Sequence, residues 1–166
     1  MRAVVVYEST YGNTRHVAEA IAEGLGNSAT VDVVPVSSAG DVNFSNLDLL
    51  VVGAPTHVHD DAQGTGDGAT ASDDLVLEPG VTVSGIREWL TSQRGAKGRA
   101  ATFDTRIEGT TVITEPASQR LADLFSDSQF ELVAGPESFL VDDGARLRPG
   151  EEERARQWGD SLARSL

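Results

Sequence analysis

The sequence predicts an α/β protein built on a three-layer, doubly wound sheet of five parallel strands. Short runs rich in Val, Leu and Ala alternate with segments of helical periodicity, in the order that βαβ units require. The first and third strand candidates, residues 3–7 and 49–52, are also apolar throughout, as expected for strands that are buried on both faces of a parallel sheet. At 166 residues the chain is expected to form a single domain, residues 1–166.

The first strand and the first helix set this pattern. Residues 3–7 form an apolar, β-branched run without polar alternation, which predicts a buried strand. The apolar residues that follow recur at helical spacing; they are Val17, Ala18, Ile21, Ala22 and Leu25. Gly24 and Gly26 are expected to end this helix, because glycine is common at helix C-termini.

The turn between this strand and this helix, residues 8–14, is rich in hydroxyl groups and contains Gly12. The first N–H groups of a helix lack partners within the helix, and the helix dipole favours negative charge there. The turn is therefore a candidate anion site. It contains no lysine, which suits a phosphate monoester better than a triphosphate. The alternative is a simple helix cap formed by Asn13 or Thr14.

The βα alternation continues to the end of the chain. Strands are predicted over residues 30–36, 49–52 and 99–103, with a fifth strand in two pieces, 130–133 and 138–141, broken by Gly135-Pro136. Helices are predicted from Ser84 or Gly85 onward, over 116–125 and over 150–166. Trp89 and Trp158 occupy helix positions that face the core, so we expect them to pack there and not to bind a cofactor.

The end of the third strand is expected to lie beside the 8–14 turn, because open α/β sheets bind ligands outside the carboxyl ends of their strands. The third strand ends in Gly53-Ala54-Pro55-Thr56-His57, and the fourth ends in Phe103-Asp104-Thr105-Arg106. A turn in which Pro55 and Thr56 have only local structural roles is the alternative for the first of these segments.

Residues 58–82 show no periodicity and are rich in Gly, Thr, Ala and Asp. A structureless stretch of this length within a domain favours either a lid over the site or a flexible insertion. Its paired acidic residues, Asp60, Asp61, Asp73 and Asp74, lack the spacing of a calcium loop, so no metal site is predicted.

The composition is strongly acidic, with a formal net charge of −13. Such a chain is not expected to bind nucleic acid, and a partner with a basic docking face is favoured by electrostatic steering; the alternative is that the charge serves only solubility. Because the sequence has no cysteine, redox chemistry would require a bound cofactor. No apolar run is long enough for membrane insertion, and the N-terminus is predicted as a strand and not a signal peptide, so a cytoplasmic location is expected.

The segment Ser9-Thr10-Tyr11-Gly12-Asn13-Thr14 resembles the phosphate loop of the flavodoxin family, Thr/Ser-x-Thr/Tyr-Gly-x-Thr after the first strand. The Gly-x-Pro-Thr-His ending of the third strand is also similar to that family. The resemblance implies a short-chain flavodoxin-like fold with FMN as cofactor. It implies three sets of cofactor-binding residues: Ser9, Thr10, Tyr11, Gly12, Asn13 and Thr14 on the phosphate; Pro55, Thr56 and His57 on the ribityl chain or the ring; and Phe103, Asp104, Thr105 and Arg106 on the ring.

The function that the resemblance implies is transfer of single electrons between redox protein partners, with the chemistry supplied by the flavin. One departure leaves alternatives open, because flavodoxins usually hold the ring between large aromatic side chains. In this sequence the second and third loops offer only His57, His59 and Phe103. A more open ring would suit a flavin-dependent reductase or oxidase of a quinone or porphyrinogen. A flavodoxin-like interaction domain that binds no flavin is the second alternative.

Overall fold

The computed structural model describes residues 1–56, 85–93, 95–108 and 115–166. Its strands are β1 (Arg2–Tyr7), β2 (Thr30–Pro35), β3 (Leu49–Pro55), β4 (Lys97–Ile107), β5 (Gln129–Leu132) and β6 (Glu137–Val141). Its helices are α1 (Asn13–Gly26), α2 (Ile86–Ser92), α3 (Ala117–Ser126) and α4 (Glu151–Arg164), with a 3₁₀ helix, η1, at Val36–Asp41. The expected βα order is therefore confirmed, and η1 is an addition to it.

The strands form one parallel sheet in the order β2-β1-β3-β4-β5, and β6 also pairs with β4. β5 pairs with the first part of β4 and β6 with its last part, so the two short strands share the fifth position. This confirms the predicted five-stranded sheet with a broken fifth strand. β4 extends to Ile107, further than its apolar run predicts, so Asp104, Thr105 and Arg106 lie within the strand.

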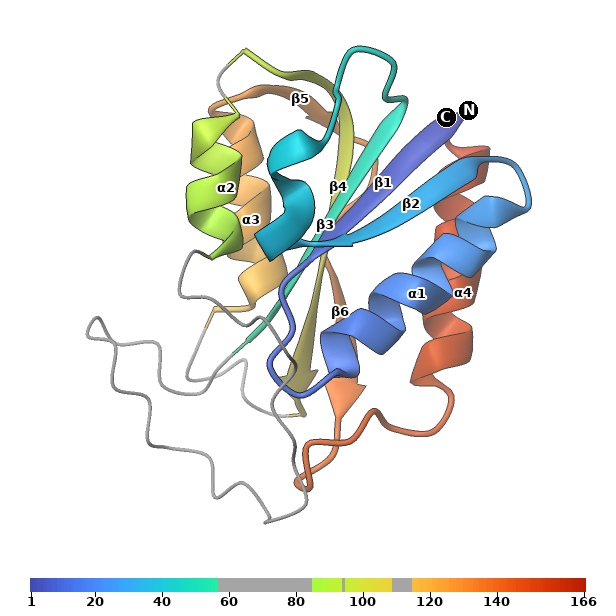
Figure 1. Cartoon of the computed structure of the whole chain (residues 1–166). Coiled ribbons are helices and arrows are strands. Elements are labelled where there is room, and N and C mark those ends of the chain that lie inside the picture. Colours follow the sequence, from blue (N-terminus) through green and yellow to red (C-terminus); the bar gives the residue numbers. More distant parts are fainter. Residues whose placement is uncertain (57–84, 94, 109–114) are drawn as a thin grey trace.

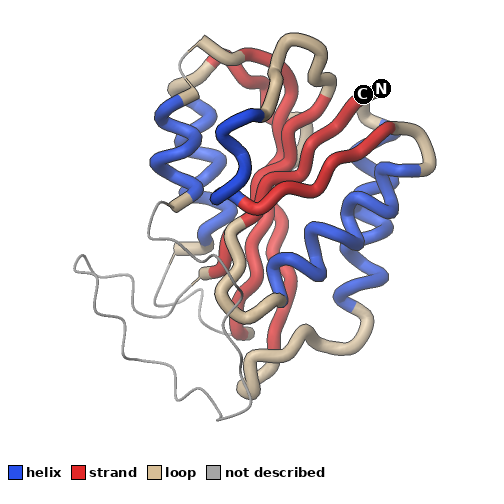
Figure 2. Tube along the Cα trace, in the orientation of Figure 1, coloured by secondary structure: helices blue, strands red, loops and turns tan. Residues whose placement is uncertain are grey.

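Helices cover both faces of the sheet, α1 and α4 on one face and α2 and α3 on the other (Figures 1 and 2). Alternate residues of each central strand therefore enter two separate cores: Val5 faces α1 and α4, whereas Val4 and Val6 face α2 and α3. Because both sides are buried, these strands need no polar alternation. Trp89 is buried in the second core, as predicted, and its Nε1 donates to the Ala39 carbonyl at 3.0 Å.

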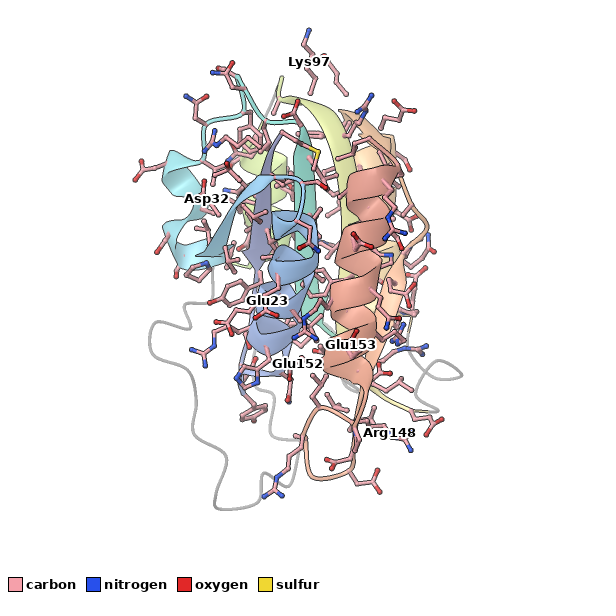
Figure 3. The ribbon with its side chains drawn as sticks, turned by 90° about the vertical axis from the view of Figure 1, so that its right-hand side faces the viewer. Glu23, Asp32, Lys97, Arg148, Glu152 and Glu153 are labelled. Atoms are coloured by element: carbon pink, nitrogen blue, oxygen red, sulfur yellow. The ribbon has the colours of Figure 1, made fainter. Side chains whose placement is uncertain are left out.

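Helices α1 and α4 pack at close range through two glycines. A Cβ added at Gly24 would lie 2.0 Å from the Arg156 carbonyl oxygen, and one at Gly159 would lie 2.2 Å from the Ile21 carbonyl oxygen. Of the two glycines predicted to end this helix, Gly26 is its last residue, which confirms the prediction, whereas Gly24 lies within α1 and lets α4 approach. At the surface, Arg156 of α4 forms an ion pair with Glu23 of α1 at 2.8 Å, which connects the two helices, and a second ion pair within α4 with Glu152 at 3.7 Å. Figure 3 labels both glutamates.

No helix in the described ranges is long and apolar enough to cross a membrane.

Candidate functional site

The carboxyl ends of β1, β3 and β4 lie next to one another, which brings together the segments predicted to form a site. Tyr7 pairs with Gly53 across β1 and β3, and Pro55 pairs with Thr105 across β3 and β4. The Glu8 N–H donates to the Gly53 carbonyl at 2.9 Å, so the 8–14 turn leaves the sheet beside the end of β3. We call this the carboxyl edge. His57 and the 58–82 segment lie outside the described residues.

The turn before α1 is shaped by Gly12, the N-cap residue, at φ 89°. This left-handed conformation favours glycine. The Ser9 hydroxyl accepts a hydrogen bond from the Gly12 N–H at 3.1 Å, within the turn. No side-chain cap is present on α1, so the alternative of a simple helix cap formed by Asn13 or Thr14 is wrong. Thr10 and Tyr11 are half-buried beside them.

Other helix N-termini at this edge are satisfied by protein groups. The Glu8 carboxylate accepts from the Ile86 N–H of α2 at 3.1 Å, and the Thr56 hydroxyl accepts from the Ala117 N–H of α3 at 2.7 Å. Helix α4 carries three glutamates in its first turn, whereas α1 has no acidic residue there. Among the α-helices that the structure describes, α1 alone has no carboxylate in its first turn and no side-chain acceptor on the N–H groups that follow its N-cap; the Ser9 hydroxyl accepts only from the N-cap N–H of Gly12. This arrangement suits an external anion.

Asn13 uses its side chain to hold the connection between β6 and α4. Its Nδ2 donates to the Ala145 carbonyl at 2.6 Å, and its Oδ1 accepts from the Leu147 N–H at 3.1 Å. Ala145 has a φ of 54°, which is uncommon for a residue with a side chain. Both polar atoms of the Asn13 side chain are therefore used within the protein. A contact between residues 132 positions apart could not be predicted from the sequence pattern.

Thr14 and Thr105 connect the turn to β4. Their hydroxyl oxygens lie 2.8 Å apart, and both side chains are buried. The Thr105 carbonyl accepts from the Thr56 N–H at 2.9 Å, which adds the end of β3 to the same network. Thr105 therefore contacts the 8–14 turn, whereas the resemblance predicts that it contacts the ring.

Asp104 is fully buried, although it is a carboxylate. Its Oδ2 accepts a hydrogen bond from the Thr56 hydroxyl, and Thr56 in turn accepts from the first N–H of α3. Its Oδ1 has no hydrogen-bond partner in the described part of the chain, and neither has Thr102 Oγ1 on the same face of β4. Buried polar atoms without partners are rare, and a water molecule, an ion or a functional role usually accounts for them.

Phe103 points away from the carboxyl edge, which corrects the expectation of a ring contact. Its side chain is fully buried between the sheet and α4, with ring centroids 6.2 Å from Phe139 and 6.5 Å from Trp158. A Cβ at Gly53 would lie 2.0 Å from the Phe103 ring, so the glycine makes room for it. Alternation along β4 puts Asp104 on the opposite face. Arg106 is half-buried, and its Nε has no partner in the described ranges.

A cavity of about 410 Å³ lies at the other end of the sheet. It is lined by Phe44, Leu90 and Phe130 among others, close to the starts of β4 and β5. It contains none of the hydroxyl-bearing residues of the 8–14 turn and is separate from the carboxyl edge.

The described residues also contain no group of three or more His, Cys, Asp or Glu side chains that could hold a metal ion.

The donor set at the carboxyl edge fits a phosphate monoester. An uncapped helix N-terminus, a left-handed glycine and neighbouring hydroxyl groups supply neutral donors, and the turn contains no acidic side chain between Ser9 and Thr14. Fold and donor set together are those of an α/β protein with a candidate phosphate site at the switch point of its sheet.

The model of the flavodoxin family matches residues 5–137, and the chain belongs to this family. Membership implies FMN as the cofactor. A search of curated proteins finds no significant match.

Solved structures share the fold at low identity. A flavodoxin from the domain Archaea is 19% identical, with a TM-score of 0.66 over 99% of this chain and 97% of that chain. Flavodoxin 1 of Bacillus cereus is 16% identical, with a TM-score of 0.64 over 100% and 99%. A WrbA-like flavodoxin of Agrobacterium tumefaciens is 18% identical, with a TM-score of 0.62 over 98% and 95%.

Proposed function

We propose that this chain carries single electrons between redox proteins by means of FMN bound at the carboxyl edge. The observation that carries the proposal is the N-terminus of α1, which lacks the protein acceptors found on α2 and α3. Family membership supplies the identity of the cofactor. Bound FMN supplies reversible one-electron chemistry at its ring, and the protein supplies binding, orientation and electrostatics.

The residues divide into two groups by their place at the edge. Backbone amides of the 8–14 turn, with the hydroxyls of Ser9, Thr10, Tyr11 and Thr14, hold the phosphate. Pro55, Thr56 and the end of β4 face the rest of the cofactor, and the family motif adds His57 as a proposed contact. The buried ring of Phe103 has no part in this arrangement.

The partners that we propose are redox proteins with a basic docking face, met in the cytoplasm. The support is the net charge of −13, which accelerates encounter with a basic surface at low ionic strength. In Figure 3 the single lysine, Lys97, lies at the end of the molecule opposite the loop that carries Arg148. That loop is the one clamped to the 8–14 turn by Asn13, so Lys97 is remote from the proposed docking edge.

Rapid mixing separates a carrier from a turnover enzyme. FMN-loaded protein, reduced by light in the absence of oxygen, is mixed with a basic haem protein such as cytochrome c at increasing salt. We expect one-electron reduction of the haem at a rate that falls steeply with ionic strength. Steady oxidation of NADH with a quinone acceptor, together with a salt-independent haem rate, would instead support the flavin-dependent reductase.

A further inference from the structure

Two hydroxyl groups meet beneath the first turn of α1. Thr14 Oγ1 and Thr105 Oγ1 lie 2.8 Å apart, and their residues are only 2% and 4% exposed. Neither hydroxyl has another hydrogen-bond partner among the described residues. Thr14 belongs to the phosphate motif, whereas Thr105 comes from β4, 91 positions later in the chain.

The hydrogens of this pair can be counted. Each hydroxyl carries one hydrogen, and only one of the two hydrogens can lie between the two oxygens. If Thr105 donates to Thr14, the Thr14 hydrogen remains available for a third group. A hydroxyl that accepts one hydrogen bond also becomes a stronger donor of its own.

A phosphate at the N-terminus of α1 would favour one of the two possible directions of the hydrogen bond between Thr14 and Thr105. Thr14 is the second residue of α1, beside backbone N–H groups that no side chain caps. Because phosphate oxygens on a dianion only accept, the favourable arrangement is the one in which Thr105 donates to Thr14 and Thr14 donates to the phosphate.

We propose that Thr105 is a positioning residue for phosphate binding: its hydroxyl donates to Thr14 and thereby directs the Thr14 hydroxyl hydrogen toward the phosphate. The inference rests on the proposed function. It also links the two halves of the site, because the Thr105 carbonyl accepts from the Thr56 N–H at the end of β3. The phosphate contact is thus coupled to the strand ends that face the rest of the cofactor.

The test compares Thr105→Val with Thr105→Ser and Thr14→Val in the full-length apoprotein. Valine keeps the β-branched shape that suits a strand, and serine keeps the hydroxyl. Affinities are measured by calorimetry for three ligands: FMN, riboflavin and inorganic phosphate. We expect Thr105→Val to weaken FMN and inorganic phosphate about tenfold, the worth of one hydrogen bond. Riboflavin binding should change less than about twofold, and Thr105→Ser should restore both phosphate ligands.

A double-mutant cycle supplies the second readout. If Thr105 acts through Thr14, the double variant should bind FMN no more weakly than Thr14→Val alone. Additive losses, or an equal loss for FMN and riboflavin, would overturn the inference. Urea unfolding of each apoprotein checks that every variant is folded under the binding conditions.

The same ligands separate this inference from the proposed function. A wild-type chain that binds inorganic phosphate but not FMN contradicts the proposed function, while the effect of Thr105→Val on inorganic phosphate still decides the inference. A wild-type chain that binds neither ligand overturns both.

Discussion

Asp104 is the only buried carboxylate in the part of the chain that the structure describes. No described Lys, Arg or His forms an ion pair with it, and its single hydrogen bond comes from Thr56. Taking a charge out of water is costly unless other groups compensate, so its place in a strand at the carboxyl edge needs a reason. The connection through Thr56 to the N-terminus of α3 supplies part of that compensation.

We predict that Asp104→Asn raises the midpoint potential of bound FMN. Reduction adds negative charge to the site, and a nearby carboxylate opposes it. The removal of a unit charge from the same site, at an effective dielectric constant of about 20, is expected to change the potential by tens of millivolts in order of magnitude. The measurement is a redox titration with reference dyes.

Thr56→Val is the matched control for this prediction. Asparagine keeps an oxygen for the Thr56 hydroxyl but removes the charge, whereas valine at position 56 removes the hydrogen bond but keeps the charge. We expect Thr56→Val to lower stability, because the Ala117 N–H and Asp104 lose a partner, with a smaller change in potential. Equal shifts in the two variants would show that the charge of Asp104 is not the cause.

The roles of some single residues could be predicted from the sequence and those of others could not, for physical reasons. The Ser9–Thr14 motif is local, so its turn and its Gly12 could be predicted from residue type and spacing. Phe103 could not be placed, because strand alternation fixes which residues share a face but does not say which face meets the ligand. The Asn13 clamp depends on a turn near Ala145, far away in the sequence.

At the scale of elements, α1 and α4 form the closest helix pair of the described fold, and glycine makes their approach possible. The helical period of α1 was predicted from its apolar residues, but the role of Gly24 was not. A glycine near the end of a helical pattern usually predicts the helix C-terminus. Only the position of α4 shows that Gly24 faces a neighbouring helix backbone. The carboxyl edge depends on this packing, because both helices begin there.

We predict that Gly24→Ala and Gly159→Ala each destabilise the protein by about 1–3 kcal/mol or more, because the added methyl must push two helix backbones apart. Gly26→Ala is the matched control in the last residue of α1, where nothing lies within 4 Å of the new Cβ. It should change stability by no more than about 1 kcal/mol, and toward greater stability. Urea denaturation measures all three. Similar stabilities for Gly24→Ala and Gly26→Ala would contradict the close packing.

At the scale of the whole molecule, the order of strands and helices could be predicted because each βα unit leaves a repeated pattern of buried runs and turns. The right-handed crossover rule then restricts how such units assemble into a parallel sheet. The fold persists at identities of 16–19% to the flavodoxins described above, so the pattern of burial is retained where individual residues are not. The ring end of the site is less predictable, since its contacts depend on loops and not on a repeated pattern.

The most direct test of the account is the visible absorption spectrum of the purified protein, taken before and after incubation with FMN and gel filtration. We predict that the flavin bands stay with the protein peak at about one FMN per chain, because the uncapped N-terminus of α1 and its hydroxyl groups hold the phosphate. If the flavin separates completely from the folded protein under saturating FMN, the proposed electron carriage is contradicted. The flavodoxin-like fold would then lack the bound flavin that this function requires.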